Sequence, residues 1–417
     1  MIIEFTVGNF LSFYEKRTIS FEAQSISELK PNVIKYEKYK LLRSAVIYGA
    51  NSSGKSNLIK ALDRMRENVL QSVRLNDLDE LDYTPFLLSD EGESNPTFFE
   101  VIFLDKNNNR LRYGFEYNLT HIINEWLFDG KTPLFLRTKD GIGVSEKFEE
   151  GKGKEKSTND NRLFISLVAQ LGGTLSKQVI EWFNNYNILS GLDHKDYNNF
   201  SLRMLHKKLE GSNESLSLFQ TLKLGFKEVL LAESEFNPLD LPESFPKSLK
   251  SKLVKELMGK TTVTLKTVHN KYNKTGHIID TVVLDKEENE SEGTNKIMDL
   301  SGPIFNTLTL SKLLIIDELD AKLHPLITIH IINLFNNPKT NPNNAQLLFS
   351  THDTNLLNSD LFRRDQIWFT EKDEMEQTDL YSLYDINLPD GTKVRNDANL
   401  EKNYIRGRYG AIPFITN

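Results

Sequence analysis

The stretch GANSSGKS, Gly49–Ser56, matches the pattern G-x-x-x-x-G-K-[ST] and lies between the apolar run Ala45–Tyr48 and an amphipathic segment that runs to Leu70. In this pattern the glycines let the backbone curl until successive N–H groups point at phosphate oxygens. Lys55 supplies a cation to the β- and γ-phosphates, and the hydroxyl of Ser56 ligates Mg²⁺. The positive end of the helix dipole adds to this attraction. The sequence therefore predicts a phosphate-binding loop between a buried strand and a helix.

A second motif, LLIIDELD at residues 313–320, consists of four apolar residues followed by two carboxylates. A buried strand that ends in Asp-Glu is where a nucleotide hydrolase holds its metal and its base. We expect Asp317 to act on the Mg²⁺ shell and Glu318 to polarise the attacking water. Acidic residues also end strands and cap helices for structural reasons. The phosphate loop favours the catalytic interpretation.

A third candidate is His352, which follows the apolar run in AQLLFSTHDTNLL. In a parallel sheet the carboxyl ends of the strands face the ligand. His352 is therefore placed to reach a γ-phosphate and to report its presence. A lone histidine is more often structural, and we give that interpretation to the other seven.

The order of these motifs predicts an interrupted domain. More than half of the chain lies between Lys55 and Asp317, which is more than a single phosphate-loop core requires. Hairpins are predicted within 97–119 and 261–285, and helical periodicity dominates 162–232. We therefore expect one half of the core within 1–150, a mainly helical insertion at 151–260, and the other half within 261–417.

The composition of the chain excludes several classes of protein. The 417 residues are 39% hydrophobic and 26% charged, with a net charge of −7 and no cysteine. These values exclude disulfides and thiolate chemistry, and they do not describe a strongly basic nucleic-acid binder. No run of 18 apolar residues and no basic signal region is present, so we expect a cytoplasmic protein without a membrane span.

Together these motifs resemble the ATPase head of the ABC type, in the branch that contains the SMC, RecF and OLD proteins. The N-terminal NFLSF and Asn51 within the phosphate loop resemble that branch in particular. The resemblance implies an α/β fold with a mixed sheet, a parallel phosphate-loop core covered by helices, and a helical insertion. It also implies binding and hydrolysis of ATP with Mg²⁺, with Lys55, Glu318 and His352 as catalytic residues.

The resemblance further implies a signature loop, for which we propose SEGT, Ser291–Thr294. The family's pattern is close to L-S-G-G-[QE], so the serine and the second glycine position are kept while Glu292 departs from it. In the family two heads enclose two nucleotides, and each signature faces the γ-phosphate held by the other head. A plain acidic connecting loop is the alternative. The nucleotide contacts implied are Gly49, Asn51, Ser53, Gly54, Lys55, Ser56, Asn57, Ser291, Gly293, Thr294 and Asp320, and the metal ligands are Ser56 and Asp317.

Five segments, ESEGT, IIDELDAKLHP, THDTNLL, RRDQIWF and YIRGRYGAIP, resemble a bacterial AAA-type subfamily of this branch. Its members include ATPases of abortive-infection and restriction-linked phage-defence loci. The resemblance implies a homodimer or higher homo-oligomer through the heads that senses or regulates a separately encoded effector, often a TOPRIM- or HNH-type nuclease. Nucleic acid is a further candidate partner.

Several alternatives stay open at this point. The chain could be an ATP-dependent DNA-binding clamp or an OLD-like nuclease component in DNA repair, with Asp77 and Asp79 as candidate nuclease ligands. RRDQIWF is either an internal ion-pair network, which we favour, or a partner surface. Arg406 and Arg408 in YIRGRYG either meet nucleic acid or belong to a docked tail. No glutamine fits the family's lid position, for which Glu100 is a weak candidate.

Overall fold

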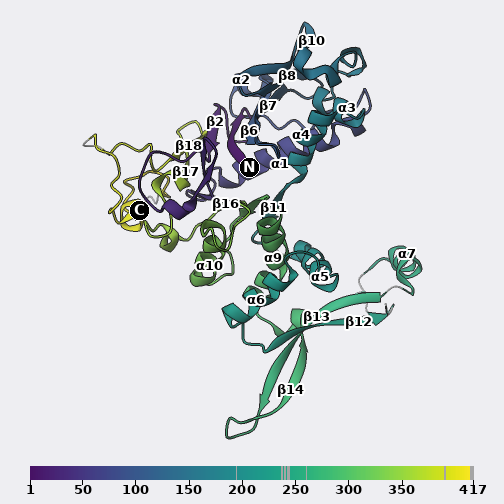
Figure 1. Cartoon of the computed structure of the whole chain (residues 1–417), viewed down its shortest axis with the longest axis vertical. Coiled ribbons are helices and arrows are strands. Elements are labelled where there is room, and N and C mark those ends of the chain that lie inside the picture. The colour runs from purple at the N-terminus through teal and green to yellow at the C-terminus, as the bar shows by residue number, and fades with distance from the viewer. Residues whose placement is uncertain are drawn as a thin grey trace. The chain divides into compact units, whose positions relative to one another are not determined.

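The chain folds as two units, and the first unit combines both ends of the sequence. The computed structural model describes residues 1–193, 195–235, 238, 241, 245–259, 261–388 and 391–413 (Figure 1). The first unit comprises Met1–Leu192 and Thr307–Asn417, and the second comprises Asp193–Asn306. The phosphate loop and the Asp-Glu motif therefore belong to one unit although most of the chain separates them.

The centre of the first unit is a six-stranded sheet in the order β11-β15-β16-β5-β17-β18. Neighbours from β11 to β17 run parallel, and β18 is antiparallel to β17. The parallel strands read as short apolar runs because both faces of the sheet are covered. Their carboxyl ends meet at one edge, where ligands bind in open α/β sheets. The strands are β5 (Ser44–Tyr48), β11 (Tyr186–Ser190), β15 (Leu313–Asp317), β16 (Gln346–Ser350), β17 (Ile367–Lys372) and β18 (Thr378–Ser382).

A second, antiparallel sheet has seven strands in the order β10-β9-β8-β7-β6-β1-β2. The hairpin predicted within 97–119 is confirmed as β6 and β7, which pair antiparallel over their whole length. Together the two sheets confirm the predicted combination of a mixed sheet with a parallel core. The strands are β1 (Ile2–Gly8), β2 (Arg17–Ser20), β6 (Thr97–Leu104), β7 (Arg110–Tyr117), β8 (Ile122–Asp129), β9 (Thr132–Thr138) and β10 (Gly141–Val144).

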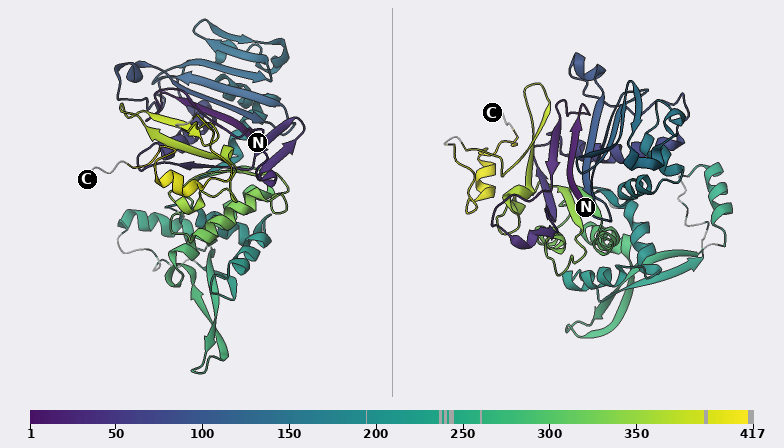
Figure 2. Two further views of the ribbon diagram at one scale, coloured as in Figure 1. Left: turned by 90° about the vertical axis from the view of Figure 1, so that its left-hand side faces the viewer. Right: turned by 45° about the horizontal axis from the view of Figure 1, so that its top comes forward.

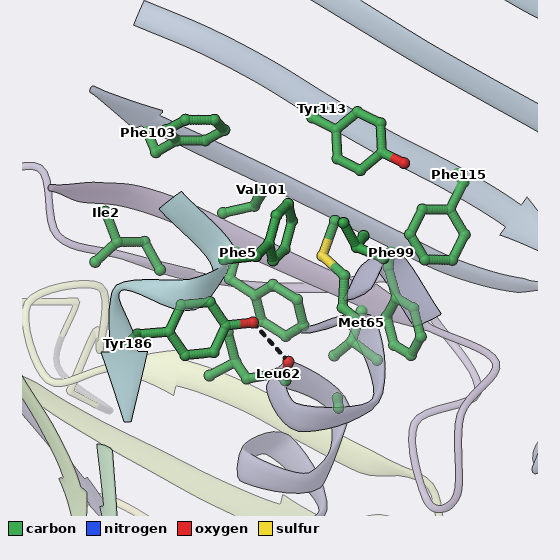
Figure 3. Close-up of a cluster of buried hydrophobic side chains, with 14 of the residues drawn as sticks. Ile2, Phe5, Leu62, Met65, Phe99, Val101, Phe103, Tyr113, Phe115 and Tyr186 are labelled. Carbon is green, nitrogen blue, oxygen red and sulfur yellow. Dashed lines mark hydrogen bonds between the residues drawn. The ribbon is translucent and has the colours of Figure 1, made fainter. Parts of the chain in front are cut away.

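The helix α1 (Lys55–Gln71) begins at the phosphate loop and packs its apolar face against both sheets. Leu62 and Met65 of α1 are buried in one cluster with Phe5 and Phe99 of the antiparallel sheet (Figure 3). The hydroxyl of Tyr186 in β11 donates to the carbonyl of Leu62 at 2.9 Å. The phosphate-loop helix is therefore fixed in position by large aromatic side chains from distant parts of the sequence.

Two long-range contacts join the N-terminal strands to the core sheet. Gln346 in β16 accepts from the N–H of Ile2 at 2.8 Å and donates to the carbonyl of Leu42 at 3.1 Å. Arg17 in β2 donates to Asp379 in β18 at 2.6 Å. As Figure 2 shows, the first strands of the chain consequently lie beside the last ones.

The remaining elements of the first unit cover these sheets, and α10 packs on β16 and β5. The expectation of helices throughout 162–232 is wrong at β11, because the five residues YNILS complete the edge of the core sheet beside β15. Among the described residues, no helix is long and apolar enough to cross a membrane. These elements are β3 (Val33–Tyr36), β4 (Tyr39–Leu42), α2 (Asp90–Ser94), α3 (Phe164–Gln170), α4 (Thr174–Asn184), α10 (Pro325–Asn336) and α11 (Leu400–Ile405).

The second unit combines helices with a three-stranded sheet in the order β12-β13-β14. The hairpin predicted within 261–285 is confirmed as β13 and β14. The helical periodicity predicted for 162–232 is also wrong at Val229, because Val229 lies in β12 and pairs with Thr267 of β13. The elements are α5 (Asn198–His206), α6 (Ser212–Leu222), β12 (Glu228–Glu235), α7 (Lys247–Leu257), β13 (Thr261–Tyr272), β14 (Ile278–Asp285), α8 (Lys286–Asn289) and the first part of α9 (Glu292–Thr309).

Candidate active site

The phosphate loop between β5 and α1 has a conformation that only glycine permits at two positions. Gly54 has a φ of +111°, and a Cβ there would overlap the side chain of Thr378. A Cβ at Gly49 would meet both the carbonyl and the hydroxyl of Thr370. L-residues rarely adopt a φ such as that of Gly54. The loop therefore forms a tight cradle whose walls come from β17 and β18.

Hydroxyl groups hold this loop from the side of β17 and β18. The hydroxyls of Ser53 and Thr370 lie 2.7 Å apart. The hydroxyl of Thr378 lies 3.0 Å from the carbonyl of Ser53 and 2.7 Å from the hydroxyl of Ser12, to which Asn57 also donates at 2.7 Å. Neither threonine belongs to a motif from which the sequence predicts a role in the site. Ser12 lies in NFLSF, so the serine of this N-terminal motif contacts the residues that hold the phosphate loop.

Lys55 is almost completely buried, and its amine binds its own loop. It donates to the carbonyl of Gly49 at 2.8 Å and to that of Ala50 at 2.9 Å. Burial lowers the pKa of Lys55 to about 8, because the charged form is desolvated. Three carboxylates oppose this shift, those of Asp317, Glu318 and Asp320. The amine can therefore exchange these two carbonyl groups for an anion, because an anion interacts more strongly with its positive charge.

The carboxylates at the end of β15 are arranged by Ser350 of the neighbouring strand β16. Its hydroxyl donates to Asp317 at 2.5 Å and accepts from the N–H of Glu318 at 2.8 Å. Glu318 has a φ of +55°, an uncommon conformation for this residue type. The N–H of Gly191 donates to the carbonyl of Asp317 at 2.6 Å, and a Cβ at Gly191 would collide with the main chain of Glu318. Both neighbouring strands therefore determine where the candidate base points.

Most of the predicted residues of the first unit line one pocket of about 460 Å³, but Asp317 and Asp320 are not among its lining residues. His352 lies across it, with its Nε2 4.0 Å from Oε1 of Glu318. Lys372 of β17 adds a second cation that the sequence analysis did not identify. Gly49 lies at the entrance of the loop and lines the adjoining pocket instead. The lining residues are Asn51, Ser52, Ser53, Gly54, Lys55, Ser56, Asn57, Glu318, His352 and Lys372.

The residues that line this pocket, together with Asp317 and Asp320 of the motif that contains Glu318, fit a nucleoside triphosphate with Mg²⁺. A Cβ at Gly54 would overlap Thr378, so glycine is needed to keep the loop in the curled form whose N–H groups can approach phosphate oxygens. Oδ1 of Asp320 is buried and has no hydrogen-bond partner among the described residues. The hydroxyl of Ser56 and the carboxylate of Asp317 are hard oxygen ligands, which Mg²⁺ prefers. These residues are the ones that would hold the nucleotide and its metal.

The two C-terminal motifs of undecided role have internal partners in the structure. Arg363 donates from Nη2 to Asp365 at 2.6 Å in a fully buried pair. Arg364 lies 2.7 Å from Glu28. These contacts confirm the internal ion-pair network predicted for RRDQIWF.

In YIRGRYG, Tyr404 donates to the carbonyl of Ala411 at 2.9 Å, and the carbonyl of Tyr409 accepts from Tyr381 at the same distance. The motif is therefore a docked tail, and it lines an adjoining pocket of about 510 Å³ beside the phosphate loop. Arg406 and Arg408 are exposed.

The candidate signature residues lie in the second unit, where Ser291 caps the helix α9. Its hydroxyl accepts from the N–H of Thr294 at 3.2 Å and lies 2.9 Å from that residue's own hydroxyl. Ser291 is exposed, whereas Gly293 and Thr294 are half-buried. Farther along α9, Asp299 forms a buried ion pair with the amine of Lys286. An exposed serine at a well-anchored helix N-terminus is suited to bind an anion.

Two weaker candidates lie outside this pocket. Glu100 accepts from the indole N–H of Trp126 at 2.7 Å and does not line the phosphate pocket. Asp77 lies 3.6 Å from Arg162, and Asp79 accepts from the N–H of Asn76 at 2.7 Å. Within the described part of the chain, no three His, Cys, Asp or Glu side chains form a group that could hold a metal.

The burial of Lys55 predicts a pH dependence of nucleotide binding. Its amine is charged below a pKa of about 8, and bound phosphates raise that pKa. Binding therefore takes up a proton above pH 8, and the affinity for a non-hydrolysable ATP analogue should fall by up to about tenfold per pH unit there. Calorimetric titration between pH 7.5 and 9.5 measures this. Lys60→Ala, exposed on the same helix, should keep the wild-type profile, whereas a constant wild-type affinity would contradict the assignment.

Comparison with known proteins places the chain in a family. The model described as "AAA domain, putative AbiEii toxin, Type IV TA system" matches residues 44–358, which is more than half of the chain. No curated protein matches the sequence.

Solved structures of similar fold have low sequence identity. An SMC head bound to the C-winged helix domain of ScpA has 13% identity and a TM-score of 0.47, and the match covers 91% of this chain and 97% of that chain. The SMC head domain from Thermotoga maritima has 11% identity and a TM-score of 0.44, covering 91% and 98%. The recombination mediator RecF with ATP has 13% identity and a TM-score of 0.38, covering 91% and 97%.

The assignment rests on the family model, whose matched residues include the phosphate loop, both carboxylates and His352. It confirms the resemblance to a bacterial AAA-type family. The chain belongs to this AAA domain family.

Proposed function

We propose that the chain binds and hydrolyses ATP between two copies of its head, and that this cycle regulates a separately encoded effector in bacterial anti-phage defence. The observation that carries the first part is that residues 51–56 of the phosphate loop, which include Lys55, line one pocket together with Glu318 and His352. A loop for phosphate, a carboxylate for water and a histidine beside that carboxylate are the parts that hydrolysis of a phosphoanhydride requires.

Each side chain of the pocket has a distinct task in this proposal. Lys55 exchanges its two loop carbonyls for phosphate oxygens, and Ser56 and Asp317 hold Mg²⁺, which neutralises phosphate charge. Glu318 accepts a proton from the attacking water, and its backbone conformation is held by Ser350. His352, 4.0 Å from Glu318, is positioned to contact the same water or the terminal phosphate.

A second copy of the chain is proposed to complete the site with Ser291, Gly293 and Thr294. The hydroxyl of Ser291 accepts from the N–H of Thr294, so its own hydrogen can be donated to a phosphate. The N-terminus of α9 adds backbone N–H groups and its dipole. Asp320, two residues after Glu318, is the remaining proposed contact at this interface.

Two substitutions separate binding from hydrolysis. Lys55→Ala should abolish both ATP binding and turnover, because the only buried cation of the loop is removed. Glu318→Gln should keep ATP binding and slow turnover by about 10²–10⁴-fold, because the amide cannot accept the proton. Equilibrium binding and phosphate-release assays measure these effects. Normal turnover by Glu318→Gln would show that another residue is the base.

The trans contact is tested by Ser291→Arg, which places a bulky cation at the N-terminus of α9. We expect ATP-dependent association of heads to be lost and turnover to fall at least about tenfold, while ATP binding by single chains persists. The matched control is Ser248→Arg, which adds the same charge at an exposed position of α7. Unchanged turnover and unchanged ATP-dependent association in Ser291→Arg would refute completion in trans.

The effector role is proposed from the family and from the sequence resemblance. The family description names a toxin and a toxin–antitoxin system, and the C-terminal motifs resemble phage-defence ATPases. A TOPRIM- or HNH-type nuclease is the effector class that we propose. In bacteria that carry the natural locus, Lys55→Ala should raise phage plaque counts to those of cells without the locus. If that variant protected the cells as well as the wild type does, defence would not depend on ATP turnover.

A further inference from the structure

The imidazole of His269 in β13 contacts the residue that directly precedes the candidate signature. Its Nε2 lies 2.9 Å from Oε1 of Glu290 and 3.1 Å from the hydroxyl of Thr267. No motif of the sequence contains His269, so the sequence predicts only a structural role for it. All of these residues, and Ser291 as well, belong to the second unit. The contact therefore joins a strand of its sheet to the segment that leads into α9.

The side chain of Glu290 is shielded from solvent. It is 7% exposed, and the side chain of His269 is 26% exposed. The ring of Phe226 lies against the imidazole, with the two ring centroids 6.4 Å apart. A carboxylate removed from water is costly unless a donor satisfies it, and the loss of one partner leaves the other uncompensated. His269 therefore stabilises Glu290 in its shielded position.

The turn that follows Glu290 is bonded to the first residues of α9. The hydroxyl of Ser291 accepts from the N–H of Thr294, and the carbonyl of Ser291 accepts from the N–H of Asn295 at 2.9 Å. Nδ2 of Asn295 also donates to the carbonyl of Glu290 at 3.4 Å. These bonds set the place of Ser291 relative to its own helix. The contact between His269 and Glu290 adds a fixed point on the sheet.

The direction of this hydrogen bond follows from the chemistry of the pair. An ionised carboxylate only accepts, so the proton of the contact is on Nε2 of His269. The neutral tautomer with its proton on Nε2 and the imidazolium both provide it. A glutamine at this position can place its amide nitrogen close to that of Nε2 and donate in the same direction, whereas a leucine cannot donate. These two substitutions therefore separate the hydrogen bond from the volume of the side chain.

We propose that His269 is a positioning residue for the nucleotide contact in trans, because it holds Glu290 and so fixes where the next residue, Ser291, points. This role rests on the proposed function, in which Ser291 donates to a phosphate held by another copy of the chain. Such contacts depend on geometry, and a displacement of about 1 Å can reduce a rate about 10²-fold. His269 is not among the residues that line the phosphate pocket, so ATP binding by a single chain should not depend on it.

Two substitutions of His269 in the full chain test this role by sedimentation with a non-hydrolysable ATP analogue and by phosphate release. His269→Leu should weaken ATP-dependent association and slow turnover at least about tenfold each, while ATP binding by single chains persists. His269→Gln should keep both within about threefold of the wild type, because its amide restores the donor. The control His277→Leu changes an exposed histidine in the turn of the same hairpin and should leave both unchanged. Equal losses in the two His269 variants would overturn the role of the hydrogen bond.

Hydrogen exchange without nucleotide tests the positioning separately from the proposed function. In His269→Leu the backbone N–H groups of Thr294 and Asn295 should exchange at least about tenfold faster, because the turn loses its contact with the sheet. The paired N–H groups of β12 should keep their wild-type rates. Equal acceleration in β12 would mean that the substitution destabilises the whole unit, and no acceleration at the turn would mean that His269 does not hold it. Either result overturns the proposal.

Ser291→Arg, measured in parallel, distinguishes failure of the positioning role from failure of the proposed function. Loss of turnover and association in Ser291→Arg but not in His269→Leu would overturn the positioning role alone. Loss in His269→Leu but not in Ser291→Arg would overturn it too, because Ser291 would not be the group that His269 positions. If neither variant lost turnover or association, completion in trans would be wrong, and the role of His269 would be wrong with it.

Discussion

The structure of the head depends on one constraint, the burial of the charged amine of Lys55 inside a loop that provides only backbone carbonyls to receive it. Desolvation lowers its pKa to about 8, and nearby carboxylates at the end of β15 only partly oppose this. A buried amine has little bound water to lose when phosphate arrives. The free energy of its contact with phosphate oxygens is therefore more favourable than that of an exposed lysine. The glycines of the loop and the hydroxyls around it keep the amine in that position.

The sequence was sufficient to predict those parts of the site that consist of short, continuous motifs. The phosphate loop, the Asp-Glu pair and the final histidine each follow an apolar strand, and strand ends meet at one edge of a parallel sheet. Thr370, Thr378 and Gly191 could not be predicted, because their roles come from contacts with residues far away in the chain. Gly191 follows strand β11, which was predicted as part of a helical segment. The five residues of β11 are too few to distinguish the periodicity of a strand from that of a helix.

The second unit contributes more than an insertion between two halves of a motif. It contains the signature candidate Ser291 at the start of α9, anchored by the buried pair of Lys286 and Asp299. Removal of either partner of such a pair would leave an uncompensated buried charge. The second unit thus contains the segment that is proposed to contact the nucleotide of another head.

The connection between the two units passes directly beside the candidate base. β11 runs parallel to β15, Gly191 donates to the carbonyl of Asp317, and the second unit begins at Asp193. Glu318 keeps a backbone conformation that costs about 1–3 kcal/mol and persists only where its neighbours enforce it. One of those neighbours, Gly191, lies two residues before the start of the second unit. The segment that leads into the second unit is therefore also part of the support of Glu318.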